Sequence, residues 1–199
     1  MIERTKLVAQ VIAAFAAGLA LCIAAVLFVA GDGPSSLLTR AAPIGGPFSL
    51  TDENGRTFTD QDLKGKPFLL FFGFVRCGVV CPVTLFEMTE VLRALGNDSD
   101  RATAVLITLD PERDTPELLK QYVESFGPDV RGLTGTPAEI ARLAKAYRVF
   151  YSKVPLGKDD YTIDHTVVVY LIDKQGRFVA PFNVKRTPEA AAADLRKFL

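Results

Sequence analysis

The sequence has few of the side chains that bind metals or carry out redox chemistry. Its 199 residues include three cysteines and one histidine. Closed structural zinc sites usually take four cysteine or histidine ligands, so a site of that kind is not expected here. Against this scarcity, Cys77 and Cys81, which lie close together in the chain, are the first candidates for a functional pair.

An excess of charge of either sign is also missing. Lysine and arginine together number 23, and aspartate and glutamate together number 23. Without the first 30 residues, which include Glu3, Arg4 and Lys6, the chain has 21 basic and 22 acidic residues. A near-neutral chain generates no field that would attract nucleic acid, so no nucleic-acid partner is expected.

The N-terminal segment is a long apolar run. Leu7 to Ala30 are 24 consecutive residues without a charge, and about 20 apolar residues span a bilayer. A cleavable signal peptide carries small residues at −3 and −1, and Phe28 fits that pattern poorly if Ala30 is at −1. Arg4 and Lys6 precede the run, so the positive-inside rule places the N-terminus in the cytoplasm. Residues 1–30 are therefore predicted to be a single-pass membrane anchor.

The segment that follows is rich in glycine, proline, serine and alanine and has little apolar periodicity. Such a composition is typical of a flexible connection. We therefore interpret residues 31–46 as a tether and residues 47–199 as one folded domain outside the cytoplasm.

The centre of this domain is a strand, a cysteine loop and a helix. Phe68 to Phe74 form an apolar run without polar alternation, which indicates a strand buried on both faces. The two cysteines follow, and an apolar helical periodicity begins at Pro82. Open α/β sheets place their chemistry beyond the carboxyl ends of strands, where this loop lies.

Local signals predict the remaining elements. Asn54-Gly55 and residues 173–176 are typical of hairpin turns. Threonine followed by proline starts three helices, since threonine caps the first amides and proline needs no partner there. The predicted elements are strands 104–109, 167–172 and 178–182, and helices 116–126, 137–147 and 188–199. The order predicts an α/β domain with a mixed sheet flanked by helices.

Cys77 and Cys81 lie at the predicted helix start, where amides and the helix dipole favour anions, so we expect stabilised thiolates. Thiolates support disulfide exchange or binding of a soft metal such as Cu(I). His165 stands before the strand at 167–172; it is either a scaffold residue or a third functional group, with Asp164 as a candidate to orient its ring.

Three motifs in order resemble those of the Sco (SenC) family: Cys-x-x-x-Cys-Pro after an aromatic strand, residues 109–116 (Leu-Asp-Pro-Glu-Arg-Asp-Thr-Pro), and Asp164-His165-Thr166. The resemblance spans about Pro47 to Leu199. It implies a thioredoxin-like domain tethered by one N-terminal transmembrane helix and facing the periplasm or the mitochondrial intermembrane space. It also implies a copper site formed by Cys77, Cys81 and His165.

By this resemblance the protein is a metallochaperone for the CuA centre of cytochrome c oxidase. It binds Cu(I), with Cu(II) left open, its partner is the CuA-bearing subunit, and it is not an enzyme. The rival hypothesis is a thiol–disulfide oxidoreductase in which Cys77 and Cys81 form the redox-active catalytic pair. Only the first hypothesis needs His165. A thiol peroxidase is a weaker third reading, because the Pro-x-x-x-Thr-x-x-Cys motif is absent before Cys77.

Overall fold

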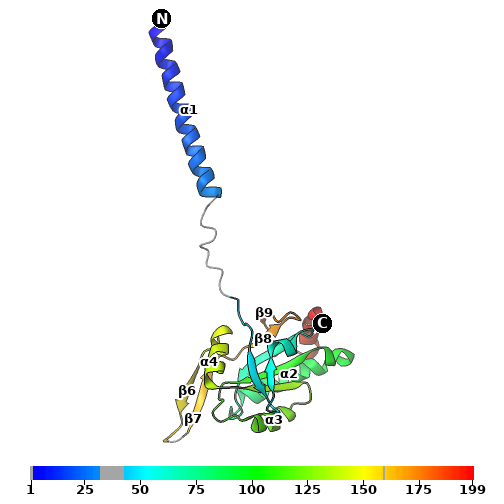
Figure 1. Ribbon diagram of the computed structural model, residues 1–199. Helices are drawn as coiled ribbons and strands as arrows, with labels where there is room; N and C mark the ends of the chain where they lie inside the picture. The colour runs from blue at the N-terminus through cyan, green and yellow to red at the C-terminus, as the bar shows by residue number, and fades with distance from the viewer. Residues whose placement is uncertain (1, 32–42, 159) are drawn as a thin grey trace. The chain divides into compact units, whose positions relative to one another are not determined.

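A computed structural model describes residues 2–31, 43–158 and 160–199. The chain divides into two units, Met1–Ala42 and Pro43–Leu199. In the first unit, helix α1 covers Ile2–Gly31 (Figure 1). Within the part of the chain that the structure describes, no helix meets the length and apolarity that a bilayer span requires. Most of the predicted tether lies outside the described residues.

The second unit contains a mixed seven-stranded sheet with helices packed on it (Figure 1). The sheet order is β2-β1-β5-β4-β3-β8-β9, and β6 pairs with β7 in a separate two-stranded ribbon. The strands are β1 (Ser49–Asp52), β2 (Thr57–Thr59), β3 (Phe68–Gly73), β4 (Thr103–Thr108), β5 (Val130–Thr134), β6 (Tyr151–Pro155), β7 (Tyr161–His165), β8 (Val169–Ile172) and β9 (Phe178–Pro181). The helices are α2 (Val80–Arg93), α3 (Pro116–Glu124), α4 (Pro137–Ala146) and α5 (Pro188–Leu195), with short 3-10 turns at Asp60–Leu63, Gly96–Arg101 and Arg196–Phe198.

Strand pairing brings three connections to one edge of the sheet. β3 runs parallel to β4, with Gly73 opposite Thr108, so the two strands end side by side. β8 runs antiparallel to β3, with Val169 opposite Phe71, so β8 begins where β3 ends. The loops after β3 and β4 and the segment entering β8 therefore meet at this edge.

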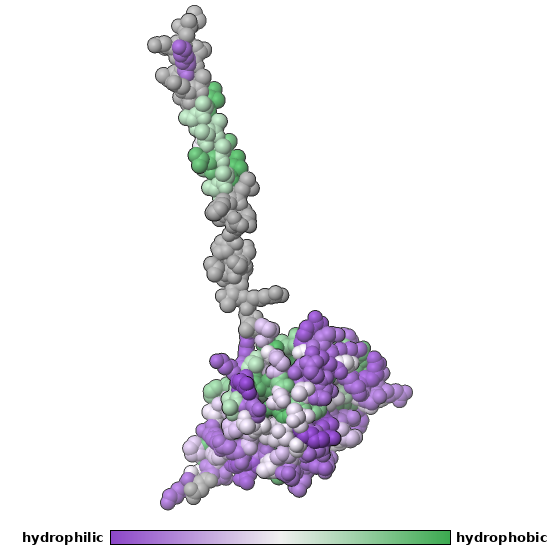
Figure 2. Space-filling view, viewed as in Figure 1, coloured by the Kyte–Doolittle hydropathy of each residue, from purple (hydrophilic) through white to green (hydrophobic). Residues whose placement is uncertain are grey.

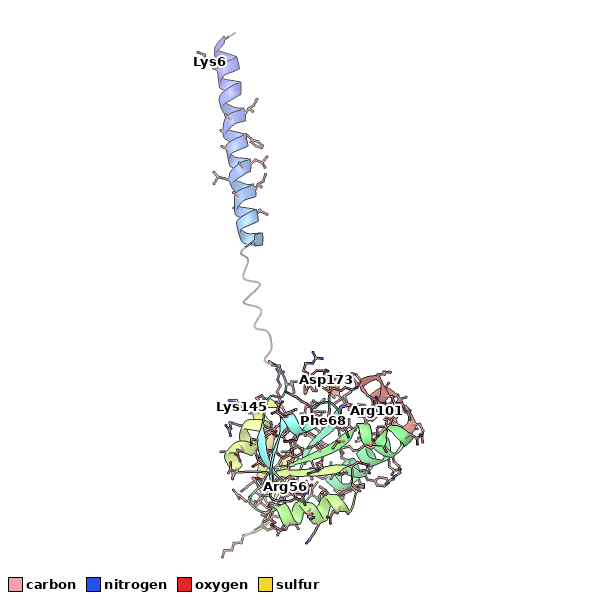
Figure 3. The ribbon with its side chains drawn as sticks, turned by 45° about the vertical axis from the view of Figure 1, so that its right-hand side comes forward. Lys6, Arg56, Phe68, Arg101, Lys145 and Asp173 are labelled. Atoms are coloured by element: carbon pink, nitrogen blue, oxygen red, sulfur yellow. The ribbon has the colours of Figure 1, made fainter. Side chains whose placement is uncertain are left out.

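The core is built on β3. All six of its residues are buried, as expected for a central strand with neighbours on both sides and helices over it. Phe68 lies inside the domain in Figure 3, whereas Arg56, Arg101 and Lys145 are exposed. Figure 2 shows a mainly hydrophilic surface on this unit, interrupted by smaller apolar areas. The apolar run of the sequence has therefore become the interior.

Several local predictions are confirmed. Both hairpins form, β1 with β2 and β8 with β9, and Gly55 adopts the positive φ of 75° that its turn requires. The hydroxyls of the three threonines before proline accept a hydrogen bond from an amide of the helix that follows: Thr115, Thr136 and Thr187.

Three features of the domain differ from the prediction. β5 was not predicted, because Arg131 and Gly132 interrupt its apolar run. The segment from Tyr151 to Asp164 is polar and turn-rich in sequence and looks like an insertion beside the site, yet it lies largely in the β6–β7 ribbon. α2 begins at Val80, two residues before the predicted start. Proline is accommodated as the third helical residue because first-turn amides have no intrahelical partners.

Gly73 ends β3 where the chain has no room for a side chain. A Cβ at this position would lie 2.9 Å from the Phe71 ring and 3.0 Å from the Cys81 sulfur. The Cys81 thiol therefore packs directly against the backbone of the central strand.

We predict that Gly73→Ala lowers the free energy of unfolding by about 1–3 kcal/mol, the usual cost of inserting a methyl group into a packed core. Gly78→Ala is the matched control, since a Cβ there meets nothing within 4 Å. Urea denaturation of the two variants and the parent measures the effect. Equal stability of Gly73→Ala and the parent would contradict the packing described here.

Candidate metal centre

The structure brings together Cys77, Cys81 and His165, the three side chains predicted to act together. Cys77 lies in the loop after β3, Cys81 in the first turn of α2, and His165 is the last residue of β7. Their two sulfurs and one ring nitrogen all lie within 4.8 Å of one another. Residues 77 and 165 are thus neighbours because β3 and β8 pair in the sheet.

The cysteine loop is a tight turn that leads into α2. The amide of Cys77 donates to the carbonyl of Phe74 at 3.2 Å, and the amide of Cys81 donates to the sulfur of Cys77 at 3.2 Å. Val79, not Cys81, is the N-cap of the helix. The helix start therefore directs an amide donor at Cys77, and Cys81 lies within the first turn.

Cys81 is fully buried, and burial raises the pKa of its thiol, with a further rise from the hydrogen bond to Cys77 and the nearby charge of Asp114. The expectation of a stabilised thiolate is therefore wrong for Cys81. The helix dipole favours an anion there, but loss of hydration outweighs it because the sulfur packs against Gly73 inside the core. Cys77, by contrast, is only partly buried.

The imidazole of His165 is fixed in one orientation. Its Nδ1 lies 3.0 Å from the carbonyl oxygen of Thr166, and because a carbonyl only accepts, Nδ1 carries the proton. In the neutral ring Nε2 is then the nitrogen without a proton, and it lies 3.7 Å from the Cys81 sulfur. The rings of Phe71 and Phe74 pack against the imidazole, with centroid distances of 6.1 and 5.9 Å.

Asp164 does not orient this ring, contrary to the expectation. It is exposed and neighbours His165 on β7, where successive side chains point to opposite faces. Thr166 supplies the partner instead. The alternation of side chains along β7 explains the difference, and the polar, turn-rich sequence of this segment did not indicate a strand.

Asp114 is a supporting residue whose role the sequence did not indicate. Its Oδ2 accepts hydrogen bonds from the amide of Val75 at 3.0 Å and from the Thr108 hydroxyl at 2.5 Å. Burial raises the pKa of its carboxyl group, although both hydrogen bonds oppose the rise. The loop after β4 is thereby tied to the cysteine loop. The sequence signal for Asp114 was the motif at residues 109–116. This motif lies beside the cysteine loop only because β3 and β4 pair and end at the same edge of the sheet.

The donor set is two sulfurs and one unprotonated imidazole nitrogen. Thiolate sulfur selects soft ions such as Cu(I), and imidazole also serves copper. One sulfur is buried and the other partly accessible, so an ion bound here would be shielded on the side of the core and open toward Cys77.

Comparison with known proteins shows which family has this architecture. The family model described as SCO1/SenC matches residues 37–199. The mitochondrial SCO1 homologue of Homo sapiens is 44% identical over 154 residues, which are 75% of this chain and 51% of the human protein. This chain therefore spans about half the length of that relative.

Two solved structures with copper bound share the fold. Bradyrhizobium japonicum ScoI is 58% identical, with a TM-score of 0.76 over 78% of this chain and 99% of the other. Yeast Sco1 is 35% identical, with a TM-score of 0.71 over 78% and 87% of the two chains. The domain thus has the thioredoxin-like α/β fold. With the family model covering most of the chain as well, this protein belongs to the SCO1/SenC family.

Proposed function

We propose that this protein binds one copper ion through Cys77, Cys81 and His165. The observation that carries the proposal is the convergence of two sulfurs and one unprotonated imidazole nitrogen within 4.8 Å. Copper-bound structures of ScoI and yeast Sco1, which have the same fold, support it. Cu(I) is the expected ion because thiolates dominate the donor set.

Each donor has a distinct part in this proposal. Cys81 must lose its proton when copper binds, and the negative sulfur then gains an ion in place of the lost hydration. Cys77 accepts a hydrogen bond from the first turn of α2, which keeps its sulfur directed toward Cys81. His165 offers Nε2 without any change of tautomer. The site is therefore formed before the ion arrives.

We further propose that the copper is cargo for the CuA centre of cytochrome c oxidase, as the resemblance to the Sco family implies. A delivering site needs one ligand that a receiving protein can reach, and Cys77 is that ligand. Exposed apolar side chains follow it in the sequence, at the N-cap and in the first two turns of α2: Val79, Val80, Val83 and Phe86. These side chains would meet the receiving subunit during transfer.

A thiol–disulfide reductase is the second candidate, and the asymmetry of the two cysteines supports it. In such a reaction the Cys77 thiolate attacks a partner disulfide and releases one partner thiolate. Cys81 then loses its proton and attacks Cys77, which closes a Cys77–Cys81 disulfide and releases the second partner thiolate. The raised pKa of the Cys81 thiol slows the second step. Copper binding is the stronger proposal because the metal itself drives this deprotonation.

The proposed location follows from the N-terminal sequence. We propose that Leu7–Ala30 anchors the protein in the membrane, with residues 47–199 in the periplasm or the mitochondrial intermembrane space. The support is the uncharged run of 24 residues, preceded by Arg4 and Lys6, together with the helical conformation of this segment.

We predict that His165→Ala loses copper to a competing chelator at least about 10-fold more readily than the parent, since even an outer partner of a ligand is worth that much. Disulfide closure and reduction of a small disulfide stay unchanged, because exchange needs only the two sulfurs. Cys77→Ser abolishes both activities, and Cys22→Ser is the control that alters neither. If His165→Ala retains copper as well as the parent, His165 is a structural residue and not a copper ligand.

We predict that the affinity for Cu(I) rises with pH. Because the pKa of the Cys81 thiol is raised, the thiol is protonated at neutral pH and copper must displace that proton. Affinity then rises about tenfold per pH unit for each proton displaced. Chelator competition between about pH 6 and pH 8, corrected for protonation of the chelator, measures the slope. A flat profile would show that Cys81 is already ionised or is not a ligand.

We predict that the N-terminal segment is retained in the mature protein. Mass spectrometry of protein purified from membranes should give the uncleaved chain, and alkaline carbonate should leave it in the membrane fraction. Replacing Leu19 and Leu21 by lysine should release it, because charges at the centre of a span are costly. A soluble product that begins near Gly31 would rule the anchor out.

A further inference from the structure

The β6–β7 ribbon carries His165 but is not part of the main sheet. Its two strands pair only with each other, so backbone hydrogen bonds of the sheet do not fix its position. Alternate side chains on β7 share a face, and Tyr161, Ile163 and His165 are such a set. Ile163 is buried and His165 lies beside Cys81, so this face is turned toward the domain.

Arg113 links this ribbon to the domain through several contacts, beside an ion pair of Lys153 on β6 with Glu112. Its Nη1 donates to the carbonyl of Tyr161 and to the carboxylate of Asp160, each at 2.9 Å. Its guanidinium lies 3.6 Å from the centroid of the Tyr161 ring. One side chain from the loop after β4 thus contacts the backbone carbonyl and the ring of Tyr161, the first residue of β7, and the carboxylate of Asp160 just before it.

Asp110 fixes Arg113 in turn. Its side chain is fully buried and accepts from Nε of Arg113 at 2.5 Å, and its other oxygen accepts from the Tyr161 hydroxyl at 2.7 Å. A buried carboxylate needs partners for both oxygens, and Asp110 finds them in Arg113 and Tyr161. We call these three residues the clasp.

We infer that Arg113 is a positioning residue for His165. The clasp holds Tyr161 at the start of β7. At the end of β7, the rings of Phe71 and Phe74 pack against His165. Moving the ribbon away from the loop after β4 would therefore carry Nε2 away from the Cys81 sulfur. The sequence showed Arg113 only as part of the motif at 109–116. Its contacts in the structure indicate that it positions the ribbon that carries His165.

Arg113→Lys tests the inference. Lysine keeps the positive charge but cannot both donate to Asp110, Asp160 and Tyr161 and lie over the Tyr161 ring as the guanidinium does. We expect it to weaken retention of Cu(I) about tenfold in the full-length protein, the effect typical of a residue that orients a metal ligand. In a His165→Ala background the same substitution should change retention little. An equal loss in both backgrounds would overturn the inference, since Arg113 would then act on the cysteines or on the fold.

Arg131→Lys is the matched control. Arg131 also pairs with two carboxylates, those of Asp52 and Glu53, and lies over an aromatic ring, that of Phe58, but it joins β5 to the β1–β2 hairpin. We expect this variant to lose stability without the coupling to His165. If the control shows the same coupling, the effect is one of general stability and the inference fails.

The copper-retention test rests on the proposed function, because it requires that the protein binds copper. A second readout does not depend on copper. Proton NMR of the metal-free protein should show NOEs from the His165 ring to the rings of Phe71 and Phe74 in the parent. These NOEs should weaken in Arg113→Lys, because the ribbon then no longer holds the imidazole against the two phenylalanines. If the parent takes up no Cu(I), the proposed function fails while this readout still decides the inference. Tyr161→Leu, which leaves the pair of Arg113 and Asp110 in place, should weaken the same NOEs if Arg113→Lys does not fold. Unchanged NOEs between His165 and the two phenylalanine rings would overturn the positioning role.

Discussion

The pairing of β3 with β4 on one side and β8 on the other is the constraint on which this protein depends. Parallel pairing makes two loops end together, and antiparallel pairing makes β8 start at the same edge. Residues as far apart in sequence as Cys81 and His165 thereby come within 3.7 Å. The strands are held by burial of their apolar side chains, so the hydrophobic core is also what assembles the donor set.

Burial gives the two thiols different chemistry. Cys81 packs against Gly73, so its proton leaves only when something replaces the lost hydration, and a metal ion can do this. Cys77 is only partly buried and precedes the exposed Val79 and Val80. The difference between the two thiols therefore comes from the first turn of α2, which places Cys81 in the core while Val79 and Val80 stay exposed.

Much of the fold was predictable because its signals are local. The apolar run of β3, the turn at Gly55 and the threonine caps each depend on residues close in sequence. β5 and the β6–β7 ribbon were missed because Arg131, Gly132 and the polar residues of the ribbon mask their strand character. The sequence named the three residues that cluster, Cys77, Cys81 and His165. The burial of Cys81 and the contacts of Asp114 and Arg113 arise between distant segments, so the sequence did not indicate them.

The most direct test of the account is the coordination of the bound ion. X-ray absorption at the copper edge of the full-length protein loaded with Cu(I) reports the atoms around the metal. The account predicts two sulfur ligands and one nitrogen ligand from an imidazole, matching Cys77, Cys81 and His165. A spectrum with sulfur ligands alone, or with one sulfur and oxygen, would contradict it.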